Sequence, residues 1–130
     1  MDELGFASTM QLLGTRNGVS FYAARRADGH FCFALASETG KGVSCDLDGT
    51  FPSPQRPVFV FPPLRRLAGF AADGVTSVAA LDASGQTLDT APVEGNVFAS
   101  PSPLPQGEAV SIEARDANGA AIWSWRLPGR

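Results

Sequence analysis

The 130-residue chain lacks the patterns that predict helices and membrane spans. No sustained set of apolar residues recurs at i, i+3, i+4 and i+7, which is the spacing of an amphipathic helix. No apolar run approaches the roughly 18 to 20 residues that a membrane-spanning helix needs. The acidic start, Met1-Asp2-Glu3, is followed by no apolar h-region, so the N-terminus does not match a secretory signal.

Positive charge, histidine and cysteine are also scarce. The 10 Lys and Arg are outnumbered by 13 Asp and Glu, which gives a net charge of −3 and no basic field to gather nucleic-acid phosphates. One histidine and two cysteines are too few ligands for a zinc site with short spacing. We therefore expect no nucleic-acid partner, no metal and no cofactor.

Glycine and proline are abundant instead. The 14 Gly and 10 Pro make up about 18% of the chain, against a usual share of roughly 12%. Short apolar or alternating runs are separated by the turn signals Asn17-Gly18, Asp28-Gly29, Asp73-Gly74, Ser84-Gly85 and Asn118-Gly119. The pattern predicts an all-β, antiparallel β-sandwich with strands near 9–16, 19–26, 30–36, 42–46, 57–61, 65–72, 75–82, 86–92, 96–99, 109–116 and 120–127.

The last turn signal fixes a register, because a two-residue turn determines which residues face each other. A turn at Asn118-Gly119 places three apolar pairs on one face: Ile112 with Trp125, Ala114 with Trp123, and Val110 with Leu127. The other face pairs Glu113 with Ser124, Ser111 with Arg126, and Arg115 with Ile122. One face is apolar and the other mostly polar, as expected for a hairpin that lies on a core.

Two proline clusters divide the chain. The segment 51–57 separates an N-terminal β-meander, residues 9–50, from the strands of residues 57–127, and 100–105 is a second rigid connection. Proline cannot donate to a strand ladder, so both segments are expected to cross between sheets or run along edges. We expect one β-sandwich domain over residues 1–130, with residues 1–8 flexible.

Several short motifs resemble those of a known family. They are the segments 71–78, 81–87, 96–98 and 114–119, with the "Asp-Gly-Val", "Asp-x-x-Gly" and "Asn-x-Phe" patterns of residues 73–75, 82–85 and 96–98. These resemble Ig-like or fibronectin-III-like β-sandwich modules of bacterial, actinobacterial-type cell-envelope proteins. Residues 21–32 and 42–45 resemble the cysteine-paired hairpin that often precedes such modules. The resemblance implies an Ig-like fold for residues 57–127 and an extracytoplasmic location, and it implies no activity.

The two cysteines have a spacing that suits a disulfide. Cys32 and Cys45 are centred on the turn 37–40, so they are expected to face each other on neighbouring antiparallel strands at a suitable Cα separation. The bond would close a loop of 14 residues and stabilise the fold by about 3 kcal/mol. Reduced buried thiols are the alternative, and metal ligation is the least favoured. A disulfide would indicate an oxidising compartment.

Catalytic and metal-binding patterns are weak. His30 shares a strand face with Cys32, but residues two apart lie roughly 7 Å from each other, and no Gly-x-Ser-x-Gly elbow accompanies it. A polar residue beside the turn at Asp28-Gly29 is the preferred interpretation of His30. Asp46 and Asp48 weakly resemble a calcium loop, without the further acidic ligands that such a loop needs.

Most aromatic residues are assigned to the core. Phe dominates, and both Trp123 and Trp125 lie on the predicted apolar face, where a sugar-binding platform would need them exposed. Consecutive side chains of Phe59-Val60-Phe61 point to opposite faces of one short strand, so we expect an exposed phenylalanine there if that strand is an edge. The binding candidates are Phe59, Phe61, Arg65 and Arg66.

The sequence favours a non-enzymatic module for protein binding or structural spacing, in the cell envelope or outside the cell. A carbohydrate-binding module is the alternative, and a hydrolase that uses His30 is less favoured. For location, an ectodomain whose signal or anchor lies outside this chain is preferred over a cytoplasmic protein.

Overall fold

The structure is a computed structural model, which describes residues 11–25, 31–38, 40–45, 51, 53–60, 66–105 and 108–127. These residues form antiparallel β-sheets and, within the described part, no helix. The strands are β1 (Gln11–Arg16), β2 (Val19–Arg25), β3 (Phe31–Ser37), β4 (Gly40–Cys45), β5 (Val58–Val60), β6 (Arg66–Ala71), β7 (Ser77–Leu81), β8 (Thr87–Pro92), β9 (Val97–Pro103), β10 (Ser111–Arg115) and β11 (Ala121–Arg126). The predicted all-β, antiparallel sandwich is confirmed.

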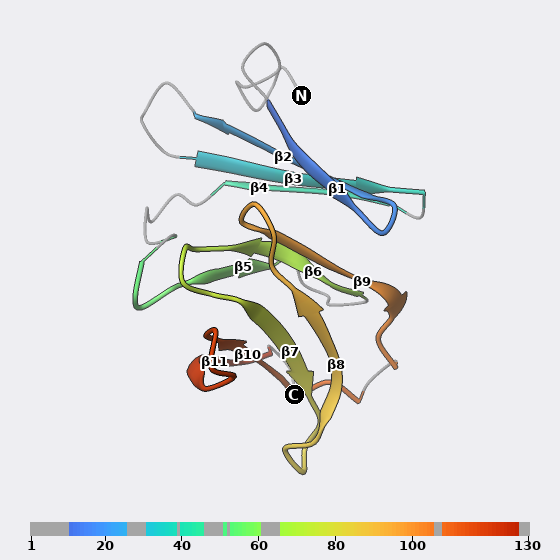
Figure 1. Ribbon diagram of the computed structural model, residues 1–130. Coiled ribbons are helices and arrows are strands. Elements are labelled where there is room, and N and C mark those ends of the chain that lie inside the picture. The colour runs from blue at the N-terminus through green and yellow to red at the C-terminus, as the bar shows by residue number, and fades with distance from the viewer. Residues whose placement is uncertain are drawn as a thin grey trace.

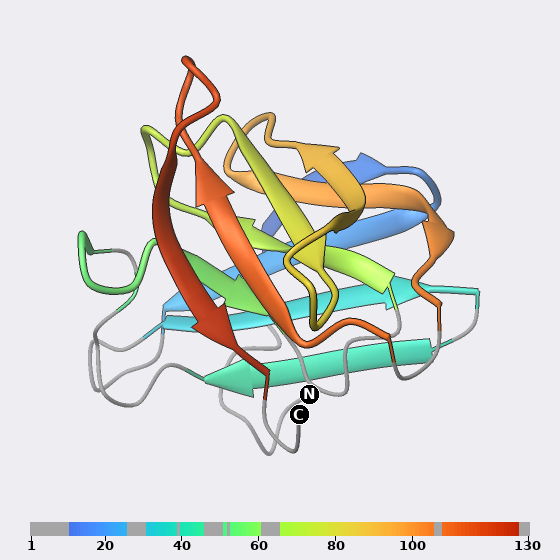
Figure 2. The ribbon, with the colours of Figure 1, turned by 90° about the horizontal axis from the view of Figure 1, so that it is seen from below.

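Three sheets stack in layers (Figure 1). The N-terminal sheet is the predicted meander, in the order β1-β2-β3-β4. The central sheet has the order β5-β6-β9, and the C-terminal sheet has the order β11-β10-β7-β8. Seen from below, the C-terminal sheet shows β11 at one edge and β8 at the other (Figure 2). The three-plus-four arrangement of the last two sheets is compatible with the Ig-like expectation.

The central sheet is buried on both faces. Along β6, Leu67 and Ala71 face the C-terminal sheet, whereas Ala68 and Phe70 face the N-terminal sheet. Strand side chains alternate between faces, so an apolar residue at every position requires a covering layer on each side. Such continuous apolar runs therefore specify the middle layer of this stack.

Each interface has its own core. Between the N-terminal and central sheets, the ring of Phe33 lies with its centroid 4.8 Å from that of Phe70, 4.9 Å from that of Phe59 and 5.4 Å from that of Phe51. Aromatic pairs at such distances contribute roughly 0.5–1.5 kcal/mol each beyond area burial. The second core, between the central and C-terminal sheets, consists mostly of aliphatic side chains. Its buried residues are Val58, Leu67, Ala71, Val75, Val78, Ala80, Ala91, Phe98, Leu104, Ala109, Ile112, Ala114 and Leu127.

The turn between β1 and β2 joins the first two layers. Asn17 and Gly18 have φ of 50° and 80°, which confirms the predicted tight turn with two left-handed residues. The Asn17 side chain donates to the Ala99 carbonyl at 2.8 Å, and the Arg66 guanidinium donates to the Asn17 carbonyl at 3.1 Å. The hairpin tip is thereby fixed to both β9 and β6.

The hairpin β10–β11 confirms most of the predicted register. Ile112 faces Trp125 and Ala114 faces Trp123, but Arg115 faces Ala121, where Ile122 was predicted. That pairing was wrong because the loop has three residues, closed by a hydrogen bond from the Asp116 amide to the Ala120 carbonyl at 3.0 Å. The extra residue is absorbed as a β-bulge, which shifts the register by one position near the turn.

The β7–β8 turn repeats this chemistry. In both turns an aspartate side chain accepts hydrogen bonds from the backbone two and four residues later: Asp82 from Ser84 and Gln86, and Asp116 from Asn118 and Ala120. A hydrogen bond from the Ser84 hydroxyl, followed by those from backbone amides, lowers the pKa of Asp82. Both aspartates therefore stabilise their turns through side-chain-to-backbone hydrogen bonds.

Two other predictions need comment. Strand β9 continues through Pro101 to Pro103, where a connection was predicted to begin at Ser100. It can do so because β9 is an edge strand of the central sheet. At an edge, the N–H that proline lacks is not needed for hydrogen bonds between two inner strands. Asp28-Gly29 and residues 1–8 lie outside the described residues.

The register of β3 and β4 places Cys32 directly opposite Cys45 and closes with Ser37 opposite Gly40, as the spacing predicted. Cys32 is fully buried.

The packing around β6 predicts that substitution by alanine has very different effects on stability at two glycines. A Cβ at Gly69 would overlap the carbonyl oxygen of Phe59 on the paired strand and lie 3.1 Å from Cζ of Phe98, whereas one at Gly14 would meet only Val97, at 3.8 Å. We expect Gly69→Ala to lower the free energy of unfolding by roughly 3 kcal/mol. Gly14→Ala is the matched control, with a change of about 0.5 kcal/mol or less. Urea denaturation of both variants measures the difference, and equal stabilities would show that β6 is not closely packed.

Candidate functional site

An open groove lies between the edge strands β5 and β11. Its volume is about 360 Å³, and its described lining residues are Gln55, Arg56, Val58, Val60, Trp123 and Trp125. β5 ends the central sheet and β11 ends the C-terminal sheet, so the groove follows the seam between two layers. We call it the tryptophan groove.

The two indoles are partly buried. They pack against the second core, on the face that the sequence predicted, but neither is enclosed as a core residue would be. The reason is that β11 is an edge strand, with no neighbouring strand beyond it in the described part of the sheet. Trp123 donates its indole N–H to the Gln55 carbonyl at 3.1 Å, which fixes that ring against the 53–57 turn.

Arg56 also lines the groove, and its guanidinium lies near the Phe59 ring of the first core. Its backbone amide donates to the Ser53 hydroxyl at 3.1 Å, within a turn that is closed by a bridge between these two residues. Its guanidinium carbon lies 5.1 Å from the centroid of the Phe59 ring, within cation–π range. Among the described lining residues of the groove there is no carboxylate.

A shallower groove adjoins the other side of the same turn. It has a volume of about 500 Å³ and is lined by Ser53, Pro54, Pro57, Ala72, Asp73, Val75 and Ile122. Ile122 is 49% exposed and lies at the β-bulge of β11, where the register skips it. The edge strand β11 therefore contributes apolar side chains to both grooves.

The four predicted binding residues are not brought together as an exposed set. Strand β5 is an edge, as the prediction required, but Phe59 is only 3% exposed and packs among the phenylalanines of the first core. As a contact candidate Phe59 was wrong, because the N-terminal sheet covers its face of β5. Arg66 is partly buried and holds the Asn17 carbonyl. Phe61 and Arg65 lie outside the described residues.

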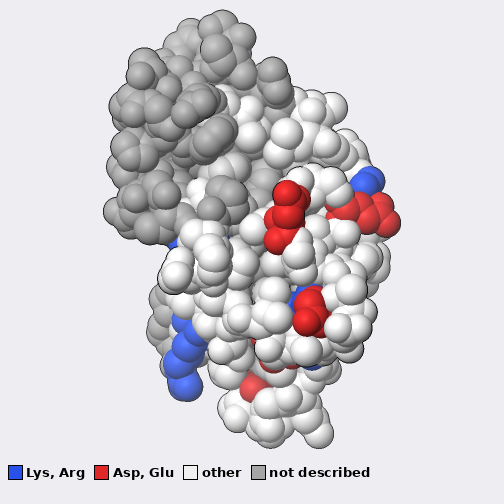
Figure 3. Space-filling model, turned by 60° about the vertical axis from the view of Figure 1, so that its left-hand side comes forward, with Lys and Arg blue, Asp and Glu red and all other residues white. Residues whose placement is uncertain are grey.

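Catalytic and metal-binding expectations receive no test from the described chain. His30, Asp46 and Asp48 lie outside it. Within the described segments, no group of three or more His, Cys, Asp or Glu side chains converges in the manner of a metal site. Figure 3 shows scattered acidic and basic side chains on a mostly uncharged face, with no extended field of one sign on the part that it colours by charge.

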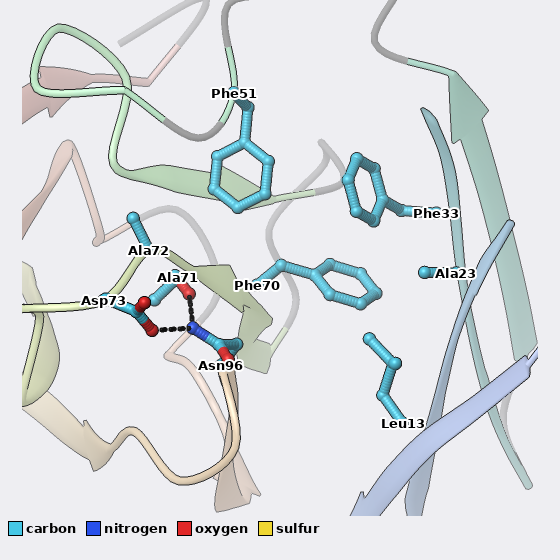
Figure 4. A pocket seen from close by; sticks show the side chains of 9 residues that line it. All are labelled: Leu13, Ala23, Phe33, Phe51, Phe70, Ala71, Ala72, Asp73 and Asn96. Atoms are coloured by element: carbon cyan, nitrogen blue, oxygen red, sulfur yellow. Dashed lines mark hydrogen bonds between the residues drawn. The ribbon is translucent and has the colours of Figure 1, made fainter. Parts of the chain in front are cut away.

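A second cavity, about 280 Å³ in volume, lies between the N-terminal and central sheets (Figure 4). Leu13 and Ala23 line it from the N-terminal sheet, and Asp73 and Asn96 line it from two turns. The remaining described lining residues are Phe33, Phe51, Phe70, Ala71 and Ala72. We call it the phenylalanine pocket.

Sequence reasoning did not anticipate this pocket. Asp73 was recognised as part of a turn signal and of one family motif, and Asn96 as part of another family motif. The two lie 23 positions apart, and they are joined by a hydrogen bond of 2.9 Å that no local pattern encodes.

In the described part of the chain there is no helix that could cross a lipid bilayer. No family model, no curated protein and no solved structure was found to match this chain. The function must therefore be argued from the geometry of these two sites.

Proposed function

We propose that this protein is a non-enzymatic, extracytoplasmic β-sandwich module that binds an extended segment of a partner protein at the tryptophan groove. The observation that supports this most directly is the pair of half-buried indoles, Trp123 and Trp125, on an edge strand beside an open groove. Aromatic side chains are enriched in the energetically dominant contacts of protein interfaces.

The edge position of β11 favours a polypeptide ligand. Along β11 only one side of the backbone is paired, with β10, in the described sheet. An extended segment can pair with such an edge through its main chain while alternate side chains enter pockets. Trp123 and Trp125 are two residues apart, which matches the spacing of alternate side chains on one face of an added strand.

The binding test uses peptides selected from a random display library on the intact protein. Trp125→Ala should weaken a selected peptide at least about tenfold, the loss expected from an interface anchor. Leu12→Ala is the matched control, because Leu12 is 59% exposed and lies on β1, outside the groove. The measurement is a fluorescence titration with labelled peptide, and circular dichroism verifies that each variant is folded.

Hydrogen bonding between the peptide main chain and β11 can be tested separately from the side-chain contacts. N-methylation at alternate peptide positions should reduce affinity when it removes the N–H groups that face β11, and should have little effect at the intervening positions. Selected peptides that bind Trp125→Ala as tightly as the wild type would contradict the proposed site. Failure to select any peptide would favour a structural spacer.

A carbohydrate ligand is the second candidate, because the indoles are more exposed than the sequence predicted. Sugar rings stack on open aromatic faces, but these indoles also pack against the core, and Trp123 uses its N–H within the protein. In a titration that is followed by the intrinsic tryptophan fluorescence of the protein, cellohexaose and chitohexaose are expected to leave the emission unchanged. Saturable quenching that Trp125→Ala removes would instead establish the carbohydrate function.

The proposed location depends on a Cys32–Cys45 disulfide, which the register permits and which would indicate an oxidising compartment. Thiol titration of the protein unfolded without reductant, after isolation from its native source, should detect no free thiol. Prior reduction of the same sample should release two and serves as the control. Two thiols without reduction would contradict both the disulfide and the argument for export. The Ig-like assignment of the last seven strands belongs to this same proposal.

A further inference from the structure

The phenylalanine pocket shares no lining residue with the tryptophan groove and lies at the other interface of the stack. Its described lining residues are mostly apolar, and the polar ones among them lie at one end. Figure 4 shows Asp73 and Asn96 at that end, the rings of Phe33, Phe51 and Phe70 in the middle, and Leu13 and Ala23 at the far side. Leu13 is 43% exposed, and Asp73 and Asn96 are also exposed, so the pocket communicates with solvent.

The polar end offers acceptors rather than donors. The side-chain amide nitrogen of Asn96 donates to the Ala71 carbonyl at 3.0 Å and to Asp73 Oδ1 at 2.9 Å, which uses both of its N–H groups. The second carboxylate oxygen of Asp73 and the side-chain carbonyl of Asn96 can still accept hydrogen bonds. A complementary ligand must therefore bring hydrogen-bond donors to this end.

The polar end is also held in place before any ligand arrives. The Ala71 amide donates to the Asn96 carbonyl at 2.9 Å, so Asn96 is joined to the end of β6 through both its backbone and its side chain. Gly95 and Asn96 have φ of 61° and 69°, within a tight turn closed by hydrogen bonds between Glu94 and Val97. Because the Asp73 carboxylate is already positioned, little conformational entropy is lost when a ligand binds to it.

The charge and the aromatic walls of the pocket determine which kind of hydrogen-bond donor a ligand should carry. No Lys or Arg is present among the described lining residues, and Asp73 carries the only formal charge among them. A carboxylate at one end of an apolar, aromatic-walled cavity favours a ligand that carries an ammonium group on an apolar body. The volume of about 280 Å³ is near the lower limit of ordinary ligand pockets, roughly 300–1,000 Å³, so the ligand must be small.

We propose that the phenylalanine pocket binds a small organic ammonium compound with an aromatic or branched alkyl body. The ammonium group lies at Asp73 and Asn96, and the apolar body lies among Phe33, Phe51 and Phe70. This site goes beyond the proposed function, because it takes a small molecule and is independent of the tryptophan groove.

The test compares three probes of similar shape and different charge: phenethylamine, 2-phenylethanol and 3-phenylpropionate. Binding to the full chain is measured by two-dimensional amide NMR, which reports both affinity and location. Phenethylamine should bind most tightly and shift the amides of residues 71–74 and 96. The alcohol should bind about tenfold more weakly, as expected when a charge-assisted hydrogen bond is lost, and the carboxylate should bind most weakly.

Variants distinguish the contribution of the Asp73 charge to affinity from that of the cavity. Asp73→Asn should weaken phenethylamine about tenfold and leave 2-phenylethanol unchanged. Glu108→Gln is the matched control, because it removes one exposed negative charge that does not line the pocket, and it should leave both affinities unchanged. Ala72→Leu, which narrows the pocket, should weaken both probes. The amide spectrum of each variant shows whether it is folded.

Several results would overturn the proposal. Equal phenethylamine affinity in Asp73→Asn and wild type would show that the carboxylate does not select the ligand. Tighter binding of 3-phenylpropionate would show the opposite charge preference. Shifts confined to other parts of the chain, or none at about 10 mM phenethylamine, where even weak fragment-sized ligands bind, would show that the pocket is not an ammonium site.

Discussion

The rest of the structure depends on the burial of both faces of the central sheet. Strand β6 has buried residues at five consecutive positions from Leu67 to Ala71, and β9 adds Val97, Phe98 and Ala99. A sheet with apolar side chains on both faces is stable in water only when two further layers cover it. The N-terminal meander supplies one of these layers and the β7, β8, β10 and β11 strands supply the other.

Both candidate sites are consequences of this layering. Three twisted sheets of unequal width cannot cover one another to every edge, so openings form along the seams between them. The tryptophan groove lies at the seam between the central and C-terminal sheets, and the phenylalanine pocket lies at the seam between the central and N-terminal sheets. The side chains at each seam continue the adjacent core: Trp125 extends the second core and Phe51 extends the first. The sites are therefore held by packing that also stabilises the fold.

Local patterns predicted most of the strands, because alternation and turn chemistry act over a few residues. The pairing of Ile112 with Trp125 followed directly from a turn position. Near the turn the prediction failed at Arg115, because the sequence Asp116-Ala117-Asn118-Gly119 suits both a two-residue turn and the three-residue loop that forms. The length of β9 was also missed, since the tolerance of an edge strand for Pro101 and Pro103 depends on which strand becomes an edge.

The sites were harder to predict than the strands, because they depend on contacts between distant parts of the chain. Phe59 was a contact candidate on the basis of alternation alone, and its burial follows from a meander that packs on it from more than 15 residues away in sequence. The alternation in β11 correctly assigned Trp123 and Trp125 to the face toward the core, but not their partial exposure. The bond between Asp73 and Asn96 joins two turns whose proximity only the assembled sheets determine.

The requirement for three layers can be tested by removing one of them. A fragment of residues 51–130 retains the central and C-terminal strands but lacks the meander that covers Phe59, Ala68, Phe70, Val97 and Ala99. Thermal unfolding of the fragment, followed by circular dichroism and amide NMR, measures whether it folds alone. We expect poor amide dispersion and no cooperative transition, because loss of the meander leaves the apolar face of the central sheet exposed to water. A fragment with dispersed amides and a cooperative transition near that of the full chain would contradict the requirement for three layers.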